Sequence, residues 1–207
     1  MKLAVIFPGV GYNTDRPLLY YSRKIVQKYG YDEVCIDYKN LETDIKGNAD
    51  KIKRTYESAY AQAKEQLEGI DFSKYEDVLF IGKSVGTAVA GACARDFGIN
   101  PRFILYTPVE GTFAVKFGDA VAFHGNSDDW CDSYKLRALC DEQNVEIHII
   151  ADANHSLETG DLSTDTQNMV NIMQWTEEYV AKSANPNLKQ VLNPYMGGNG
   201  YVPDGEP

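Results

Sequence analysis

The chain has 207 residues, a length that fits one domain large enough to bury a substantial core. It carries 30 acidic and 20 basic residues, and its formal net charge is −10. Nucleic acids and anionic membranes attract positively charged surfaces, so this charge argues against both classes of partner. No apolar run reaches membrane-spanning length, and the apolar start of the chain fits a first strand better than a signal peptide.

A C-x-x-C spacing would indicate a redox motif or a metal site, and the cysteines of this sequence do not show it. There are four of them: Cys35, Cys93, Cys131 and Cys140. We therefore expect reduced thiols and a cytoplasmic location. No cluster of histidine, cysteine and carboxylate residues has the spacing of metal ligands, so the sequence predicts neither a metal ion nor a cofactor.

Apolar strand patterns alternate with helical patterns along the chain. The expected strands are Leu3–Phe7, Val34–Tyr38, Val78–Ile81, Phe103–Thr107, Ala120–Gly125 and Val145–Ile150. The expected helices are Pro17–Tyr29, Ala49–Leu67, Thr87–Phe97, Tyr134–Glu142 and Asp165–Ala181. This alternation predicts an α/β fold in one domain over residues 1–182, with a six-stranded, mostly parallel sheet and helices on both faces.

Residues 183–207 differ in composition from the rest of the chain. Twelve of them are asparagine, glycine or proline, which predicts a tail without helix or strand. The tail also carries apolar residues: Leu188, Val191, Leu192, Tyr195 and Tyr201. We therefore expect it to lie along the body of the protein or along a neighbouring subunit, which leaves a homo-oligomer open.

The stretch FIGKSVG, residues 80–86, fits two different motifs. A phosphate-binding P-loop ends in Gly-Lys-Ser, but it needs another glycine five residues before Gly82. That position is Asp77, whose carboxylate would repel a phosphate, and residues 78–81 form an apolar strand instead of a loop. The P-loop interpretation therefore fails on spacing and on charge.

The same stretch also fits a G-x-S-x-G turn that presents a nucleophilic serine. Gly82 and Gly86 would let the backbone make a tight strand-to-helix turn around Ser84. The hydroxyl would then lie at the carboxyl end of a strand, where open parallel sheets bind ligands. The pattern is weak by itself, because a glycine-rich turn with a solvent-facing serine looks the same.

A nucleophilic serine needs a base, and the sequence has three histidines. His148 lies inside an expected strand and is interpreted as a packing residue. His124 ends a strand, where a structural role is favoured over a catalytic one. His155 stands in the loop ADANHSLE after the last strand, and no apolar periodicity explains it. His155 is therefore the candidate base.

The candidate acid is Asp128, just past the fifth strand in HGNSDDW. A solvated pair of aspartates is the alternative interpretation. We expect Asp129 to cap a turn or face water and Asp132 to be the N-cap of the next helix. Ser84, Asp128 and His155 follow the ends of three different strands in this chain order, which is the order of an α/β-hydrolase triad.

Three motifs, GKSVG, HGNSD and ANHSLE, together resemble the α/β-hydrolase superfamily, in particular its small, capless dienelactone-hydrolase-like and carboxylesterase-like members. The resemblance covers about residues 1–182. It implies that Ser84 is the nucleophile, Asp128 the acid and His155 the base. FPGVG stands where the family has its oxyanion loop, which implies that the Val10 and Val85 amides form the oxyanion hole.

The sequence departs from the family at three points. Pro8 replaces a common histidine, and the first two antiparallel strands of the family are missing, which leaves six. Lys83 stands where histidine is frequent. We expect Lys83 to be a surface residue, with a role in attracting an acidic substrate as the alternative. None of these departures removes a member of the triad.

The predicted activity is hydrolysis of a small-molecule carboxylic ester or thioester by a serine hydrolase. A non-catalytic binding protein on the same fold, or a peptidase or acyltransferase with the same triad, are the alternatives. Only residues 108–119 join the fourth and fifth strands, so no cap domain is encoded there. An open cleft predicts short acyl groups. Its expected substrate contacts are Gly11, Tyr12, Phe113 and Trp130, although the last two also fit core or rim aromatics.

Overall fold

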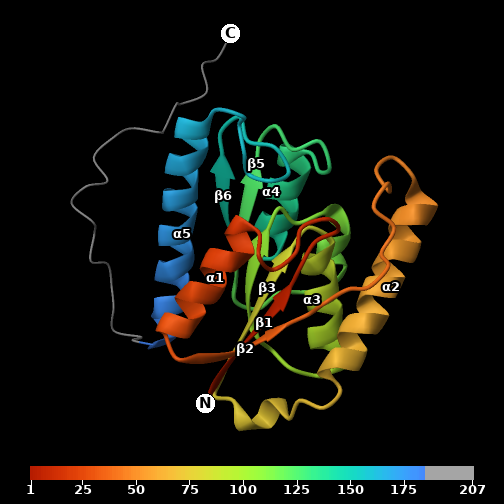
Figure 1. Ribbon diagram of the computed structural model, residues 1–207, viewed down its shortest axis with the longest axis vertical. Coiled ribbons are helices and arrows are strands. Elements are labelled where there is room, and N and C mark those ends of the chain that lie inside the picture. The colour runs from red at the N-terminus through yellow and green to blue at the C-terminus, as the bar shows by residue number, and fades with distance from the viewer. Residues whose placement is uncertain (185–207) are drawn as a thin grey trace.

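The computed structural model describes residues 1–184 of the chain, which form one central sheet covered by helices (Figure 1). The sheet order is β2-β1-β3-β4-β5-β6, and all neighbouring strands are parallel. The strands are β1 (Lys2–Phe7), β2 (Tyr31–Cys35), β3 (Asp77–Lys83), β4 (Arg102–Tyr106), β5 (Ala120–Gly125) and β6 (Glu146–Ile150). The predicted α/β fold with a six-stranded sheet is confirmed.

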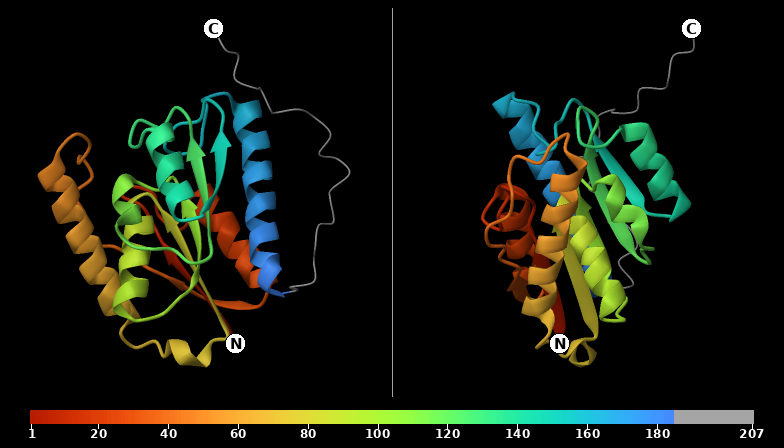
Figure 2. Two further views of the ribbon diagram at one scale, coloured as in Figure 1. Left: turned by 180° about the vertical axis from the view of Figure 1, so that it is seen from behind. Right: turned by 90° about the vertical axis from the view of Figure 1, so that its right-hand side faces the viewer.

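Two layers of helices cover the sheet. The helices are α1 (Pro17–Lys28), α2 (Ala49–Leu67), α3 (Val85–Asp96), α4 (Ser133–Glu142) and α5 (Leu162–Ala184), with short 3₁₀ turns η1 (Phe72–Lys74) and η2 (Glu110–Ala114). α1 and α5 pack on one face, and α2, α3 and α4 pack on the other (Figures 1 and 2). None of the described helices is both long and apolar enough to cross a membrane.

The continuous apolar runs of the sequence arise because the inner strands are buried on both faces. In β1, Leu3, Val5 and Phe7 point into the α2–α3–α4 layer, whereas Ala4 and Ile6 point into the α1–α5 layer. This alternation follows from the two-residue period of a strand. Because neither face of such a strand meets water, its sequence is a continuous run of apolar residues.

The second strand was predicted at Val34–Tyr38, but β2 runs from Tyr31 to Cys35. Gly30 has a φ of +76°, and this turn leads the chain from α1 directly into Tyr31. β2 pairs only with β1, and an edge strand accepts polar side chains such as Asp32 and Glu33. The apolar pattern therefore placed the strand three residues too late.

The connection between β4 and β5 contains only the 3₁₀ turn η2, so no cap domain is inserted there. α5 runs to Ala184, two residues past the boundary that was predicted between domain and tail. The expected tail contacts fall on residues 185–207, which lie outside the described residues.

Candidate active site

The turn between β3 and α3 holds Ser84 in an unusual backbone conformation. Its φ is 55° and its ψ is −124°, values that a residue with a side chain rarely adopts. Both flanking glycines are required here. A Cβ on Gly82 would lie 2.7 Å from the Thr87 Cα, and one on Gly86 would lie 2.2 Å from the Phe7 carbonyl oxygen.

The turn brings Ser84 together with the other two predicted members of the triad. The His155 Nε2 lies 2.7 Å from the Ser84 Oγ, and the His155 Nδ1 lies 2.7 Å from an Asp128 carboxylate oxygen. Each residue follows a different strand, namely β3, β5 and β6. The three side chains thus form one continuous chain of hydrogen bonds. Their catalytic roles stay predictions.

Asp128 is held in place by its own loop. Its side chain is fully buried, and its second carboxylate oxygen accepts a hydrogen bond of 2.9 Å from the Trp130 backbone N–H. Burial alone would raise the pKa of Asp128, but the hydrogen bond and the charge of His155 outweigh it, so the pKa lies below its ordinary value. Asp128 is therefore ionised at neutral pH and can orient an imidazole.

His155 is mostly covered, with 19% of its side chain exposed. The Trp130 ring stacks on it with a centroid distance of 5.4 Å. Burial lowers the pKa of His155; the Asp128 hydrogen bond opposes this shift, and the charge of Lys83 adds to it. The pKa stays below its ordinary value, so the imidazole is neutral at pH 7. A neutral imidazole can accept a proton from the Ser84 hydroxyl.

The loop after β1 lies against the serine turn, as the predicted oxyanion loop must. A Cβ on Gly9 would lie 3.3 Å from the Ser84 Cβ, so a larger residue here would crowd the serine turn. Two backbone hydrogen bonds between Gly9 and Tyr12 close the loop. The amides of Val10 and Val85 donate no hydrogen bond to a described residue, so both N–H groups are free for a ligand oxygen. Their role as oxyanion donors stays a prediction.

The four expected substrate contacts have different surroundings. The Trp130 ring stacks on the His155 imidazole, and Tyr12 stands half-buried in the loop beside Ser84. Gly11 is exposed at the tip of that loop with a φ of +69°. Phe113 packs edge-on against Phe117 of the core, at 5.9 Å between centroids, which fits its alternative interpretation as a core aromatic.

The structure corrects the expected position of Lys83. Its residue is only 2% exposed, whereas the sequence predicted a surface residue. β3 lies between β1 and β4, and helices cover both faces of the sheet, so the Lys83 side chain is covered whichever face it enters. A lysine at the end of an apolar strand gives no sequence signal of its direction, and for this reason its burial was missed.

The remaining candidates take structural positions. His148 stacks on Trp175, at 4.5 Å between centroids, which confirms it as a packing residue. Asp132 is the N-cap of α4 and accepts a hydrogen bond from an amide of the first turn, as predicted. Asp129 is exposed and pairs with Lys46, whose ammonium also lies 5.9 Å above the Trp130 ring. Nothing in the sequence indicated that Lys46 would reach the site.

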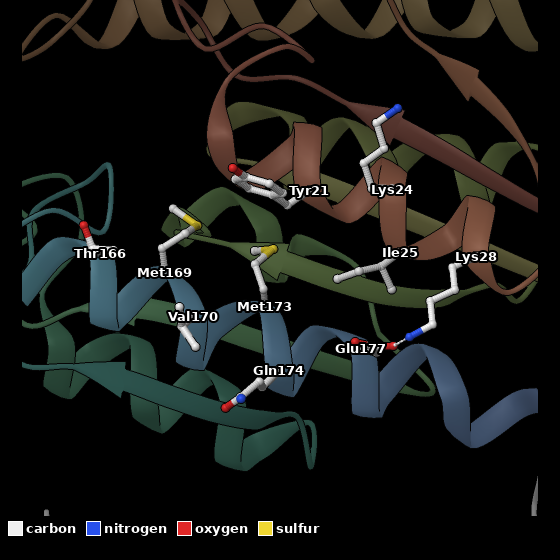
Figure 3. Close-up of a pocket in the computed structure, with 10 residues that line it drawn as sticks. All are labelled: Tyr21, Lys24, Ile25, Lys28, Thr166, Met169, Val170, Met173, Gln174 and Glu177. Atoms are coloured by element: carbon white, nitrogen blue, oxygen red, sulfur yellow. Dashed lines mark hydrogen bonds and ion pairs between the residues drawn. The ribbon is translucent and has the colours of Figure 1, made fainter.

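Other pockets of the described residues lie away from this chain of hydrogen bonds, among them one along residues 162–170. A groove of about 580 Å³ opens between α1 and α5, and Met169, Met173 and Ile25 face it (Figure 3). None of the three triad residues lines it. Another pocket of about 350 Å³ adjoins the loop of residues 8–14 and the segment after β2. Among residues 1–184, no group of three or more histidine, cysteine or acidic side chains is placed to hold a metal ion.

No family model and no curated protein sequence matches the chain. Solved structures do match it. A lid-less α/β serine hydrolase from Xanthomonas campestris shares 14% identity over 88% of this chain and 82% of its own, with a TM-score of 0.63. An α/β serine hydrolase homologue from Coxiella burnetii shares 14% identity over 86% and 84%, with a TM-score of 0.59. The protein Est1E from Butyrivibrio proteoclasticus, solved with ferulic acid bound, shares 12% identity over 88% and 90%, with a TM-score of 0.60.

The chain has the α/β-hydrolase fold. At these identities the likeness shows the fold alone. The first of these structures is described as lacking a lid, and this chain likewise has no domain inserted between β4 and β5. In this α/β-hydrolase fold, the strained serine, the histidine and the aspartate all lie at the carboxyl edge of the sheet.

Proposed function

We propose that this protein is a serine hydrolase that cleaves carboxylic esters or thioesters with short acyl groups. One observation carries the proposal: Ser84, His155 and Asp128 form a hydrogen-bonded chain with both distances at 2.7 Å, on a serine held at a strained φ. A solvent-facing serine in an ordinary turn would need neither the strain nor a neutral histidine within hydrogen-bond distance.

In the proposed mechanism, the Ser84 Oγ attacks the carbonyl carbon while its proton passes to the His155 Nε2. Asp128 accepts the hydrogen bond from the Nδ1–H and stabilises the imidazolium that forms. The bond to the leaving oxygen or sulfur then breaks, and His155 returns the proton to that atom. A water molecule, deprotonated by His155, attacks the acyl-enzyme and releases the carboxylic acid and free Ser84.

The developing oxyanion requires donors close to Ser84. The free N–H of Val85 stands at the amino end of α3, where the helix dipole favours negative charge, and the free N–H of Val10 stands in the adjacent loop. We assign both to the oxyanion hole. Donors of this kind contribute roughly 3 kcal/mol each to transition-state stabilisation in water-excluded sites.

Labelling of the intact protein with a fluorophosphonate probe tests the proposal. We expect a stoichiometric adduct on Ser84, with none on the Ser84→Ala variant. His155→Ala should label far more slowly, because the hydroxyl then lacks its base. Folded protein that stays unlabelled would favour the non-catalytic binding protein instead. Hydrolysis of p-nitrophenyl acetate by the same sample separates a hydrolase from a site that reacts only once.

The preference for short acyl groups follows from the missing cap. No domain roofs the carboxyl edge of the sheet between β4 and β5, so a long chain stays largely in water. Each added methylene then gains much less than the roughly 0.8 kcal/mol of full burial. We expect kcat/KM for p-nitrophenyl esters to be highest at about two to four carbons. A steady rise to eight carbons would contradict the open cleft but not the hydrolase assignment.

A further inference from the structure

Lys83 is the buried charge next to the nucleophile in the chain, and the proposed mechanism does not use it. It is the last residue of β3 and stands directly before Ser84. Within the described residues, the contact of its ammonium is the Tyr12 ring and not a hydrogen-bond acceptor or a carboxylate, although the residue is only 2% exposed. Burial of an unpaired ammonium is unfavourable, so a packing role alone does not explain a lysine at this position.

The ammonium of Lys83 instead lies over an aromatic ring of the predicted oxyanion loop. Its Nζ is 5.1 Å from the centroid of the Tyr12 ring, a cation–π contact in a covered environment. Tyr12 is fixed from both sides. Its hydroxyl accepts a hydrogen bond of 3.1 Å from the Leu18 N–H of α1, and its backbone is bonded to Gly9.

The stem of Lys83 supports the same loop. A Cβ on Gly9 would lie 3.1 Å from the Lys83 carbonyl oxygen and 3.4 Å from its Cγ. Lys83 therefore lies close to the loop on both sides of Val10, with its stem near Gly9 and its ammonium over the Tyr12 ring. The Val10 N–H can donate to an oxyanion only if its position is fixed to within a few tenths of an ångström, so neighbours that hold the loop in place are needed.

The charge of Lys83 also acts on the catalytic histidine. Lys83 directly precedes Ser84, whose Oγ lies 2.7 Å from the His155 Nε2, and a positive charge at this position opposes protonation of the imidazole. The other charged groups around the site do not neutralise it. Asp128 attracts the Lys83 ammonium but is already bonded to His155, and Asp129 faces solvent with Lys46 as its partner.

We propose that Lys83 is a positioning residue of the active site: its ammonium holds Tyr12 and the loop of residues 8–12 against the serine turn, and its charge opposes protonation of His155. The inference rests on the proposed function for its catalytic consequence, but the contacts themselves do not depend on it. Burial lowers the pKa of Lys83 to about 7, so the lysine is cationic in the acidic range where His155 titrates.

Two variants separate the charge of Lys83 from its shape. Lys83→Met keeps an unbranched side chain of similar length without the charge, and Lys83→Arg keeps the charge. The first measurement is an NMR titration of the His155 ring in the resting protein, where only three histidines contribute signals. We expect Lys83→Met to raise the pKa of His155 by on the order of one unit, and Lys83→Arg to leave it close to the wild-type value.

The second measurement is the pH profile of kcat/KM for p-nitrophenyl acetate. Its acidic limb is expected to move to higher pH in Lys83→Met and to stay in Lys83→Arg. Below pH 7, where Lys83 is largely cationic, and after each rate is corrected for the fraction of neutral His155 given by the NMR titration, Lys83→Met and Tyr12→Leu should each lower kcat roughly tenfold, and the double variant should be little worse. Thermal unfolding is the check on folding, because the loss of a buried unpaired charge leaves the melting temperature unchanged or raises it.

The outcomes separate this inference from the proposed function. An unchanged pKa of His155 in Lys83→Met, or additive effects of the Lys83 and Tyr12 variants, would overturn the role of Lys83 even in an active enzyme. A wild-type protein that fails to label with fluorophosphonate would overturn the hydrolase assignment, and the NMR titration would still decide whether the charge of Lys83 acts on His155.

Discussion

Two polar clusters lie at opposite ends of the sheet, and they are built in opposite ways. At the amino end, Arg102 donates to the Asp77 carboxylate at 3.3 Å, to the Tyr31 hydroxyl at 2.9 Å and to the Tyr179 carbonyl oxygen at 2.8 Å. The Tyr179 hydroxyl in turn donates to Asp119 at 2.9 Å. Three nitrogens of the guanidinium therefore have partners, although the group is largely buried.

At the carboxyl end, polar groups are buried without full satisfaction. The His124 Nδ1 and the Thr107 Oγ1 are buried and have no hydrogen-bond partner among the described residues. The ammonium of the nearly buried Lys83 lies over an aromatic ring. Ser84 and Thr107 also have positive φ angles, at 55° and 43°. The carboxyl end thus combines strain with unpaired groups, and the amino end holds a network whose groups have partners, which is the contrast expected if the proposed hydrolase site lies at the carboxyl end.

The largest expected effect is the loss of catalytic rate when Ser84 or His155, at the carboxyl end of the sheet, is replaced. Ser84→Ala and His155→Ala should each lower the rate of ester hydrolysis by about three orders of magnitude or more, and the double variant should be little worse, because the two residues act as one unit. For Ser84→Ala the free energy of unfolding should stay the same or rise slightly, since the side chain at a strained φ contributes little packing, whereas His155→Ala also removes the partner of the buried Asp128 and should lower it. An unfolding midpoint that drops with Ser84→Ala would remove the contrast between the two ends.

The next effect tests which aspartate serves as the acid. Asp128→Asn keeps the size of the side chain but removes the charge that stabilises the imidazolium, and a rate loss of about 10³–10⁴ is expected. Asp129→Asn is the matched control, because its carboxylate is exposed and paired with Lys46, and it should retain most of the activity. Steady-state kinetics of both variants decides which aspartate is the acid. A collapse in the Asp129 variant alone would shift the assignment by one residue.

The order of the elements made the positions of Ser84, Asp128 and His155 predictable, because parallel strands bring their carboxyl ends to one edge whatever lies between them. The direction in which a side chain points was not predictable. The sequence does not say which way Lys83 points at the end of an apolar strand, and contacts between distant loops, such as Lys46 with Trp130, leave no local pattern. The edge strand β2 was misplaced for a related reason, since one partner strand demands fewer apolar residues than two.

A substitution in the Arg102 network at the amino end of the sheet should lower the free energy of unfolding and leave the rate of ester hydrolysis nearly unchanged. Arg102→Met leaves the Asp77 carboxylate, whose side chain is 13% exposed, without its cation. Breaking such a pair destabilises a protein by about 3 kcal/mol. Urea unfolding at pH 7 measures this loss, and the kcat of the folded variant should stay within about twofold of the wild type, since the cluster lies at the other end of the sheet from Ser84. A large loss of kcat with intact stability would show that the two ends are coupled.

The smallest expected effect concerns the pH dependence of stability. Burial lowers the pKa of His124 in the carboxyl-end cluster, so the folded protein binds fewer protons there than the unfolded chain does. A group with a lowered folded pKa contributes stability that is fully present above its unfolded pKa, near 6.5, and is lost as the pH falls below that value.

His124→Gln removes this titration while an amide can still reach the Ser133 hydroxyl, which lies 3.0 Å from the His124 Nε2 in the wild type. We therefore expect the variant to lose less stability than the wild type between pH 7 and pH 5, whereas Arg102→Met should lower stability by a similar amount at both values. Urea unfolding at the two pH values gives the comparison. An equal acid-induced loss in His124→Gln and in the wild type would mean that His124 does not contribute to this loss and that the acid sensitivity arises elsewhere.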